Sequence, residues 1–159
     1  MSGFLHLSDF HLVEDETSLS RVFNAKYILK NTIDKIVDKK KDFGNLDGVI
    51  ITGDISDDGS TTSYSDAYDI LKELNLPLLA IPGNHDLREP MMKYFAKDTN
   101  IQNPEFFDWV YETSDTLIIG LDTLVEGQNH GMLRSESLNL LFEKLSQPTE
   151  KNIILTIHH

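Results

Sequence analysis

The chain has 159 residues, of which 40% are hydrophobic, enough for one domain with a buried core and too few for two comfortable ones. Its formal net charge is -12, from 26 acidic and 14 basic residues, and this field disfavours broad nucleic-acid binding. It has no cysteine, which rules out disulfides and thiolate metal ligands. The N-terminus lacks a signal-peptide pattern and no apolar run approaches a membrane span. We therefore expect a cytoplasmic protein with neither nucleic-acid nor membrane partners.

The first half of the chain alternates short apolar runs with helical patterns. Residues 4–8 (FLHLS) alternate as a strand does, and apolar residues then recur at helical spacing from 22 to 37. Residues 48–52 form an apolar run typical of a strand covered on both faces, and residues 63–74 form a second amphipathic helix. Another buried type of strand is predicted at residues 78–81.

The second half continues the alternation. The pattern predicts a short helix at residues 91–96 and a hairpin formed by residues 106–111 and 116–121. A third clear helix covers residues 135–145, and a β-rich run follows at residues 152–157. This order predicts an α/β domain with a largely parallel sheet, in which functional residues gather at the carboxyl ends of strands.

Candidate metal ligands follow the first two predicted strands. Asp9 and His11 are two residues apart, so both side chains can reach one cation, although a surface Asp and a loop His would give the same spacing. Gly53 and Asp54 follow the second strand, where the glycine permits a sharp turn and the carboxylate can bridge two cations. An Asp that starts a turn or caps a helix is the alternative.

Two further strands also end in polar side chains. Asn84 and His85 lie side by side in the segment PGNHD, and His158 and His159 end the chain. A terminal His pair is also what the stub of a purification tag leaves, but here no linker separates it from the strand. An ordered set that offers only oxygen and nitrogen donors favours a shared metal site over coincidence.

The segments LSDFH, ITGDISDDG, PGNHD and LTIHH resemble successive signature blocks of the calcineurin-like metallophosphoesterases. The resemblance covers essentially the whole chain and is nearest to bacterial class III cyclic-nucleotide and glycerophosphodiester phosphodiesterases. It implies one α/β domain over residues 1–159, a β-sandwich flanked by helices on both sides (αββα). It also implies a metal-dependent phosphoric ester hydrolase, a phosphodiesterase rather than a monoesterase, whose substrate is small, such as a cyclic nucleotide or a glycerophosphodiester.

The resemblance further implies a two-metal centre. Asp9 and His11 would bind the first metal, Asp54 would bridge, and Asn84 and His158 would bind the second. The donors suit divalent or trivalent Mn, Fe, Zn or Co. Two cations about 3.5 to 4 Å apart lower the pKa of a bridging water and neutralise charge during in-line attack on phosphorus.

The same resemblance implies two catalytic residues that do not bind metal. His85 would stabilise the phosphoryl transition state or protonate the leaving oxygen, and Asp57 would orient it. The related phosphoprotein phosphatases have Arg immediately after that Asp, whereas this chain has Asp58, so phosphoprotein substrates are disfavoured.

One family block is absent. The pattern continues beyond the HH block with Gly-His-x-His, whose histidines complete both metal sites, and this chain stops first. We therefore expect an incomplete domain that lacks part of its second sheet, exposes apolar strand edges and can form homo-oligomers through them. For these residues alone we expect a partial site with weak metal binding and little turnover. His130 is expected at the surface, and His6 in a core or interface.

Two other functions stay open. A catalytically inactive remnant or scaffold module would keep the fold, but it has no physical need for clustered charged ligands. A nuclease of the same superfamily is disfavoured by the net charge and by the lack of a basic, aromatic-interleaved stretch.

Overall fold

The structure is a computed structural model that describes residues 2–15, 24–101, 103 and 105–159. The first predicted helix begins at residue 22, which lies outside the described residues. In chain order the elements are β1 (Phe4–Leu7), α1 (Ala25–Asp38), η1 (Lys40–Phe43), β2 (Gly48–Thr52), α2 (Thr61–Leu71), η2 (Lys72–Leu74), β3 (Leu78–Ile81), α3 (Arg88–Phe95), β4 (Trp109–Glu112), β5 (Thr116–Gly120), α4 (Ser135–Leu145) and β6 (Asn152–Thr156).

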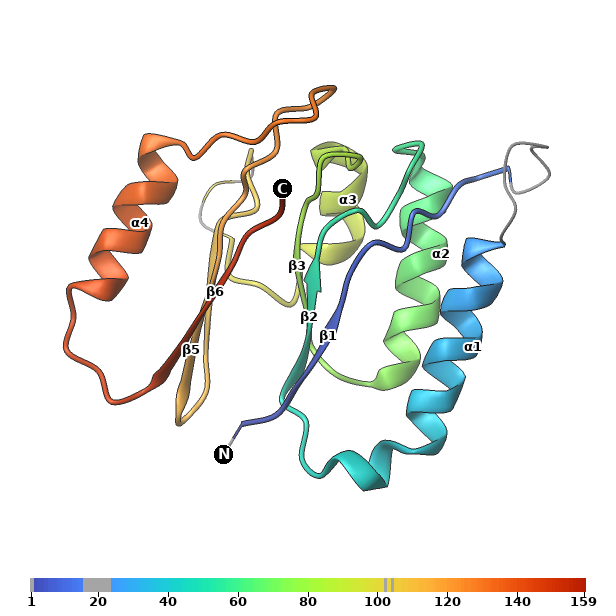
Figure 1. Cartoon of the computed structure of the whole chain (residues 1–159), viewed down its shortest axis with the longest axis horizontal. Helices are drawn as coiled ribbons and strands as arrows, with labels where there is room; N and C mark the ends of the chain where they lie inside the picture. Colours follow the sequence, from blue (N-terminus) through green and yellow to red (C-terminus); the bar gives the residue numbers. More distant parts are fainter. Residues whose placement is uncertain (1, 16–23, 102, 104) are drawn as a thin grey trace.

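The strands form two three-stranded sheets. In the first sheet, of order β1-β2-β3, all strands are parallel, whereas in the second β5 pairs antiparallel with β4 and parallel with β6. The prediction of a largely parallel sheet is therefore correct for the first sheet, and the β4–β5 hairpin makes the second one mixed. Figure 1 shows that β1, β2, β3 and β6 all run toward the same side of the molecule, so their carboxyl ends lie together.

Three apolar clusters hold four layers together (Figure 1). The first lies between the β1-β2-β3 sheet and helices α1 to α3, and the third lies between the other sheet and α4. The middle cluster joins the inner faces of the two sheets; its buried members are Ile50, Leu79, Ile81, Trp109 and Ile118. The αββα sandwich predicted from the family resemblance is confirmed.

Two predicted boundaries were wrong. The predicted short helix, α3, begins at Arg88 rather than at residue 91, and β4 begins at Trp109 rather than at residue 106. Before β4, the amide of Phe107 donates to the Asp122 carboxylate at 3.0 Å, so that residue is held by a side chain and not by a sheet ladder. The apolar residues of this segment could not reveal whether its amides would bond a side-chain carboxylate or a neighbouring strand.

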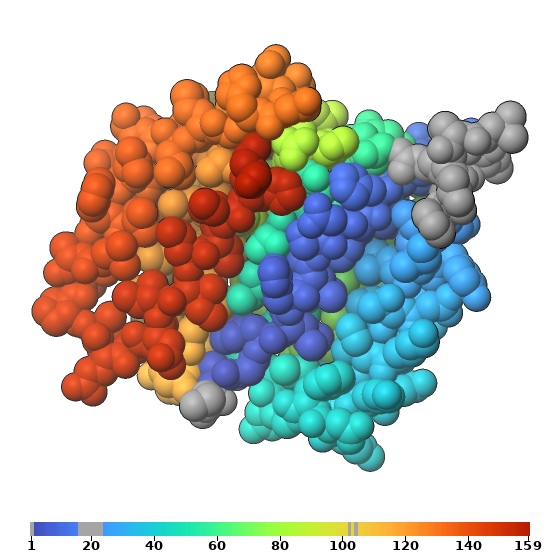
Figure 2. All heavy atoms as spheres, in the orientation of Figure 1, coloured from blue at the N-terminus to red at the C-terminus, as the bar shows by residue number. Residues whose placement is uncertain are grey.

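Strands β1 and β6 are edge strands within the described residues. Three apolar residues in or just after β6 are about half exposed to solvent: Ile153 at 45%, Leu155 at 46% and Ile157 at 51%. Figure 2 shows β6 and β1 on one face, where they flank a groove of about 600 Å³. The exposed apolar edge expected from the sequence is thus present, and self-association through it stays a prediction. Among the described residues, no helix has both the length and the apolar character needed to span a bilayer.

A tryptophan links the two sheets. The Trp109 indole donates from Nε1 to the carbonyl of Ala80 at 2.7 Å, and its ring lies directly on Gly120 of the neighbouring strand. A Cβ built on Gly120 would lie 2.3 Å from Trp109 Cε2, so glycine is what allows this contact.

The loop before α2 centres on a carboxylate. Asp58 accepts the amides of Glu14 and Ser60 and the hydroxyls of Ser56 and Ser63, at 2.7 to 3.0 Å. Partial burial acts to raise the pKa of Asp58, but these hydrogen bonds outweigh it and hold the pKa well below its usual range. The ionised form therefore stabilises the start of α2.

We expect Gly120→Ala to lower the free energy of unfolding by about 1–3 kcal/mol, because the added methyl overpacks the Trp109 contact. Urea unfolding followed by the fluorescence of this single tryptophan measures the change. Asn139→Ala, an exposed change on α4, is the control and should stay within about 0.5 kcal/mol. Equal stability of both variants would contradict the contact's importance.

The depressed pKa of Asp58 also determines the direction in which the free energy of unfolding changes with pH. A carboxyl whose folded pKa is lowered contributes stability above its unfolded pKa of about 4 and loses it as pH falls toward the folded pKa. The stability difference between the parent chain and Asp58→Asn should therefore be largest near neutral pH and shrink below about pH 4. Urea titrations at several pH values measure it, with exposed Asp69→Asn as the control; a difference independent of pH would refute the depressed pKa.

Candidate metal centre

Three loops carry the sequence-predicted residues to one side of the molecule, except for His158, which follows β6. We name them the DH loop (residues 8–13), the GD loop (residues 53–59) and the NH loop (residues 82–87). Beyond β1 and β2 the backbones of the DH and GD loops stay hydrogen-bonded, from Asp9 N to Gly53 O at 3.1 Å and from His11 N to Asp54 O at 2.9 Å. The candidate ligands of these two loops are therefore fixed relative to one another by main-chain bonds.

The backbone at this place is strained. Asp9, His11 and Asp54 have φ of 59°, 49° and 52°, in the left-handed region that side chains with a Cβ rarely adopt. The only other described non-glycine residue with positive φ is Asn75, at the end of η2. Strain on the order of 1–3 kcal/mol per residue gathers at functional sites, where it aims side chains.

Asp54 lies at the centre of the site and is 4% exposed. Its Oδ1 accepts the amide of His85 at 3.0 Å, and its Oδ2 faces His11 Nε2 at 3.6 Å and His158 Nε2 at 3.5 Å. A Cβ on Gly83 would lie 2.2 Å from Asp54 Oδ1, so only glycine allows the NH loop to approach this closely. The sequence predicted that these strand ends meet, and in the structure they do.

The two histidines present Nε2 to the site because Nδ1 is used elsewhere. His158 Nδ1 donates to the Thr52 carbonyl at 2.6 Å, and His11 Nδ1 donates to Asp57 Oδ1 at 3.1 Å. A hydrogen bond of this kind fixes the tautomer of metal-binding histidines. In the neutral ring the Nε2 lone pair then points toward the carboxylate of Asp54.

The remaining predicted ligands lie beside Asp54. Asn84 Oδ1 is 3.3 Å from His158 Nε2, and Asp9 Oδ1 is 3.8 Å from His11 Nε2. Ligand atoms of Asp9, His11 and Asp54 all lie within 4.8 Å of one another. Carboxylate, amide and neutral imidazole groups that converge on one place are donor types that a cation binds, so the donor set fits metal ions.

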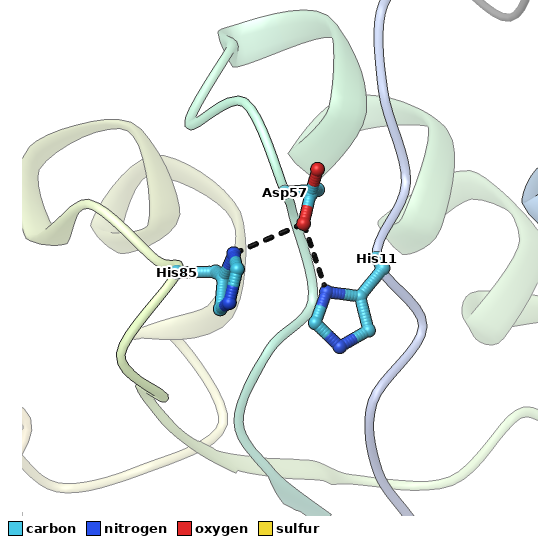
Figure 3. Close-up of side chains that lie close together, drawn as sticks. All are labelled: His11, Asp57 and His85. Carbon is cyan, nitrogen blue, oxygen red and sulfur yellow. Dashed lines mark hydrogen bonds and ion pairs between the residues drawn. The ribbon is translucent and has the colours of Figure 1, made fainter. Parts of the chain in front are cut away.

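A second cluster surrounds Asp57 (Figure 3). Its Oδ1 lies 3.0 Å from His85 Nδ1 and 3.1 Å from His11 Nδ1, and the two imidazole rings meet edge to face at 4.9 Å. The His85 side chain is 42% exposed, so its Nε2 can reach a ligand in solution. The sequence led us to expect the contact of Asp57 with His85, but the contact with His11 had no signal in it.

Sequence reasoning also missed a buried carboxylate in the NH loop. Asp86 is 1% exposed and accepts hydrogen bonds from the GD loop, from Gly83 of its own NH loop and from Tyr64 of α2. Burial raises the pKa of Asp86, although its hydrogen bonds oppose this shift; burial, with the charge of Asp86, also raises the pKa of Tyr64, which is therefore a neutral donor. The motif PGNHD contains Asp86, which was the available signal.

A buried ion pair fixes α3 to the second sheet. The Arg88 guanidinium donates to both carboxylate oxygens of Asp122, at 2.7 and 2.9 Å, and Asp122 is fully buried. The amides of Phe107 and Leu124 also donate to this carboxylate. The NH loop is thereby held between β3 and a helix that is bonded across to the other sheet.

The other histidines lie outside this cluster. His130 is exposed, as expected. His6 is exposed on β1, where its Nε2 lies 2.8 Å from Thr52 Oγ1, so the core alternative was wrong and the interface alternative stays a prediction. The His159 ring lies against Gly131, and its Nδ1 is 2.9 Å from Thr123 Oγ1.

Comparison with known proteins gives concordant matches. The family model described as calcineurin-like phosphoesterase matches residues 3–159. A probable glycerophosphodiester phosphodiesterase GpdQ of Arcobacter nitrofigilis is 35% identical over 113 residues, 71% of this chain and 41% of the relative. A probable cyclic nucleotide phosphodiesterase of Coxiella burnetii is 33% identical over 155 residues, 96% of this chain and 58% of the relative.

Two further matches extend over nearly the whole chain. A cAMP/cGMP dual specificity phosphodiesterase of Mycobacterium tuberculosis is 29% identical over 160 residues, 98% of this chain and 48% of the relative. A solved structure, TT1561 of Thermus thermophilus, superposes with a TM-score of 0.56 at 17% identity and covers 96% of this chain and 66% of that one, a likeness of fold alone. The chain spans about half the length of the curated relatives it matches. With its fold and a family model that matches nearly every residue, the chain belongs to the calcineurin-like phosphoesterase family.

Proposed function

We propose that this chain supplies ligands of the binuclear metal centre of a phosphodiesterase that hydrolyses small phosphodiesters. The observation that carries the proposal is the convergence of His11 Nε2 and His158 Nε2 on one carboxylate oxygen of Asp54, at 3.6 and 3.5 Å. Because the two imidazoles approach this carboxylate from two different segments, Asp54 would serve as a ligand shared by two cations.

The ligands divide into two sets around Asp54. Asp9, His11 and Asp54 would hold one cation, and Asp54, Asn84 and His158 the other. Two bound cations supply Lewis-acid chemistry, which activates water and neutralises phosphoryl charge. The residues suit Mn, Fe, Zn or Co, since all donors are oxygen or imidazole nitrogen.

His85 would act on the substrate itself. Its Nδ1 contacts Asp57 at 3.0 Å, which orients the ring and leaves the exposed Nε2 to meet a phosphoryl or leaving oxygen. When the ring is protonated, Nε2–H can stabilise developing charge or donate its proton to the departing alkoxide. Asp57 holds His11 and His85 together, so it couples a metal ligand to the substrate-facing group.

The relatives indicate a class of substrate. They are named as cyclic nucleotide and glycerophosphodiester phosphodiesterases, and we propose one of these small phosphodiesters for the protein that carries this chain. The net charge of -12 supports a small substrate over a polyanion. A cytoplasmic location, consistent with the lack of cysteine, stays a prediction.

Asp54→Asn should abolish paired metal binding. Removal of a group that only supports a ligand costs about 10–100-fold in metal affinity, so loss of a shared ligand should cost at least about 100-fold. Titration calorimetry with Mn²⁺ measures affinity and stoichiometry, and Asp69→Asn, which changes an exposed carboxylate on α2, should bind as the parent does. Unchanged binding by Asp54→Asn would remove Asp54 from the centre.

His85→Asn should lower turnover without loss of metal. In the longest native form of the protein, loaded with Mn²⁺, we expect a fall in kcat of about 10²–10⁴-fold toward bis(p-nitrophenyl) phosphate, because a general acid or charge stabiliser is lost. His130→Asn, at an exposed loop histidine, is the matched control and should keep the parent rate. Metal bound to that native form without any turnover of this ester would instead support an inactive module.

A further inference from the structure

One heavily hydrogen-bonded side chain near the site, Asp86, is not a candidate ligand. Both oxygens of Asp86 are occupied by donors from outside its own residue: Oδ2 accepts the amides of Ile55 and Gly83 at 3.3 and 2.9 Å, and Oδ1 accepts the amide of Ser56 at 3.0 Å. The fourth donor is the Tyr64 hydroxyl, at 3.1 Å from Oδ1. All four groups are donors, which matches an ionised carboxylate that can only accept.

The three amide donors come from two loops that are not paired as strands at this point. Ile55 and Ser56 lie in the GD loop, directly after the bridging carboxylate, and Gly83 lies in the NH loop, directly before Asn84. One buried carboxylate therefore crosslinks the two loops immediately beside their candidate ligands.

Tyr64 completes this crosslink from the helix behind the loops. Its side chain is fully buried, and its hydroxyl donates to Asp86 while it accepts the amide of Leu87 at 2.7 Å. The ring itself belongs to the apolar cluster under the first sheet. A hydroxyl fixed by the core thus holds both the carboxylate and the far end of the NH loop.

We propose that Tyr64 and Asp86 are positioning residues that set the separation of the GD and NH loops, and with it the placement of the groups on either side of Asp54. A local reporter of that separation exists in the His85 amide, which donates to Asp54 Oδ1 across the two loops at 3.0 Å. The consequence for metal binding rests on the proposed function, whereas the consequence for this amide does not.

The test replaces the hydroxyl and keeps the ring. Tyr64→Phe should accelerate hydrogen exchange of the His85 amide about tenfold or more in the metal-free chain, the factor expected when a closed state loses a hydrogen bond of ordinary strength. It should also weaken Mn²⁺ binding about 10–100-fold, as loss of a supporting group does at other metal sites. NMR-detected exchange and titration calorimetry measure the two effects.

Two controls lie on the same helix. Tyr68→Phe removes a hydroxyl that accepts a hydrogen bond from Lys97. Ile70→Val deletes a buried methylene, and this deletion reduces the stability of the fold without loss of a polar group. Neither control should change exchange at His85 or Mn²⁺ affinity. Asp86→Asn, which keeps one acceptor oxygen, should have a smaller effect than Asp86→Ala.

The outcomes separate positioning from general stability and from the metal proposal. The inference is overturned if the His85 amide stays protected in Tyr64→Phe, or if Ile70→Val accelerates its exchange equally. It is also overturned if the parent protein binds Mn²⁺ and Tyr64→Phe binds the ion with the same affinity. If the longest native form of the protein binds no Mn²⁺, the proposed function fails, and the exchange data alone then decide whether these residues position the loops.

Discussion

The buried carboxylate of Asp54 is the point on which the site depends, because three other chain segments are bonded to it or face it. The NH loop donates the His85 amide to one oxygen, while the DH loop and the end of β6 bring imidazoles to the other. The Asp54 carbonyl also accepts the amide of His11. A shift of β2 against any neighbour would displace groups on every side of this carboxylate, so the geometry is a property of the whole sandwich.

Close approach at Asp54 is possible only because glycines flank it. A Cβ on Gly53 would lie 2.7 Å from His158 Nδ1, and one on Gly83 would lie closer still to the carboxylate. The left-handed backbone at Asp9, His11 and Asp54 adds strain that the backbone bonds between the DH and GD loops must offset. Local preferences are thus overruled where the site is built, which is where functional sites depart from ideal geometry.

The sequence predicts which residues reach the site better than it predicts what holds them. Parallel strands end at one edge, so ligands placed after four strands could be expected to meet. The orientation of His158 by the Thr52 carbonyl depends on a backbone group that carries no residue-type signal. Tyr64 matches an ordinary core position of an amphipathic helix, and its partner Asp86 lies 22 residues away, so no periodicity reveals the pair. The division of the strands into two sheets came from the family resemblance alone.

Charge connects this site to the size of its substrate. Asp9, Asp54 and Asp57 are three carboxylates in one cluster of a chain with net charge -12, and without cations they would repel each other and any phosphodiester. In the proposed centre two divalent cations would outweigh these three carboxylates, so the local field would become positive although the chain as a whole is negative. Screening would confine that positive field to about 8–10 Å at physiological ionic strength. A small phosphodiester would fit within that distance, whereas the flanking phosphates of a polynucleotide would extend beyond it.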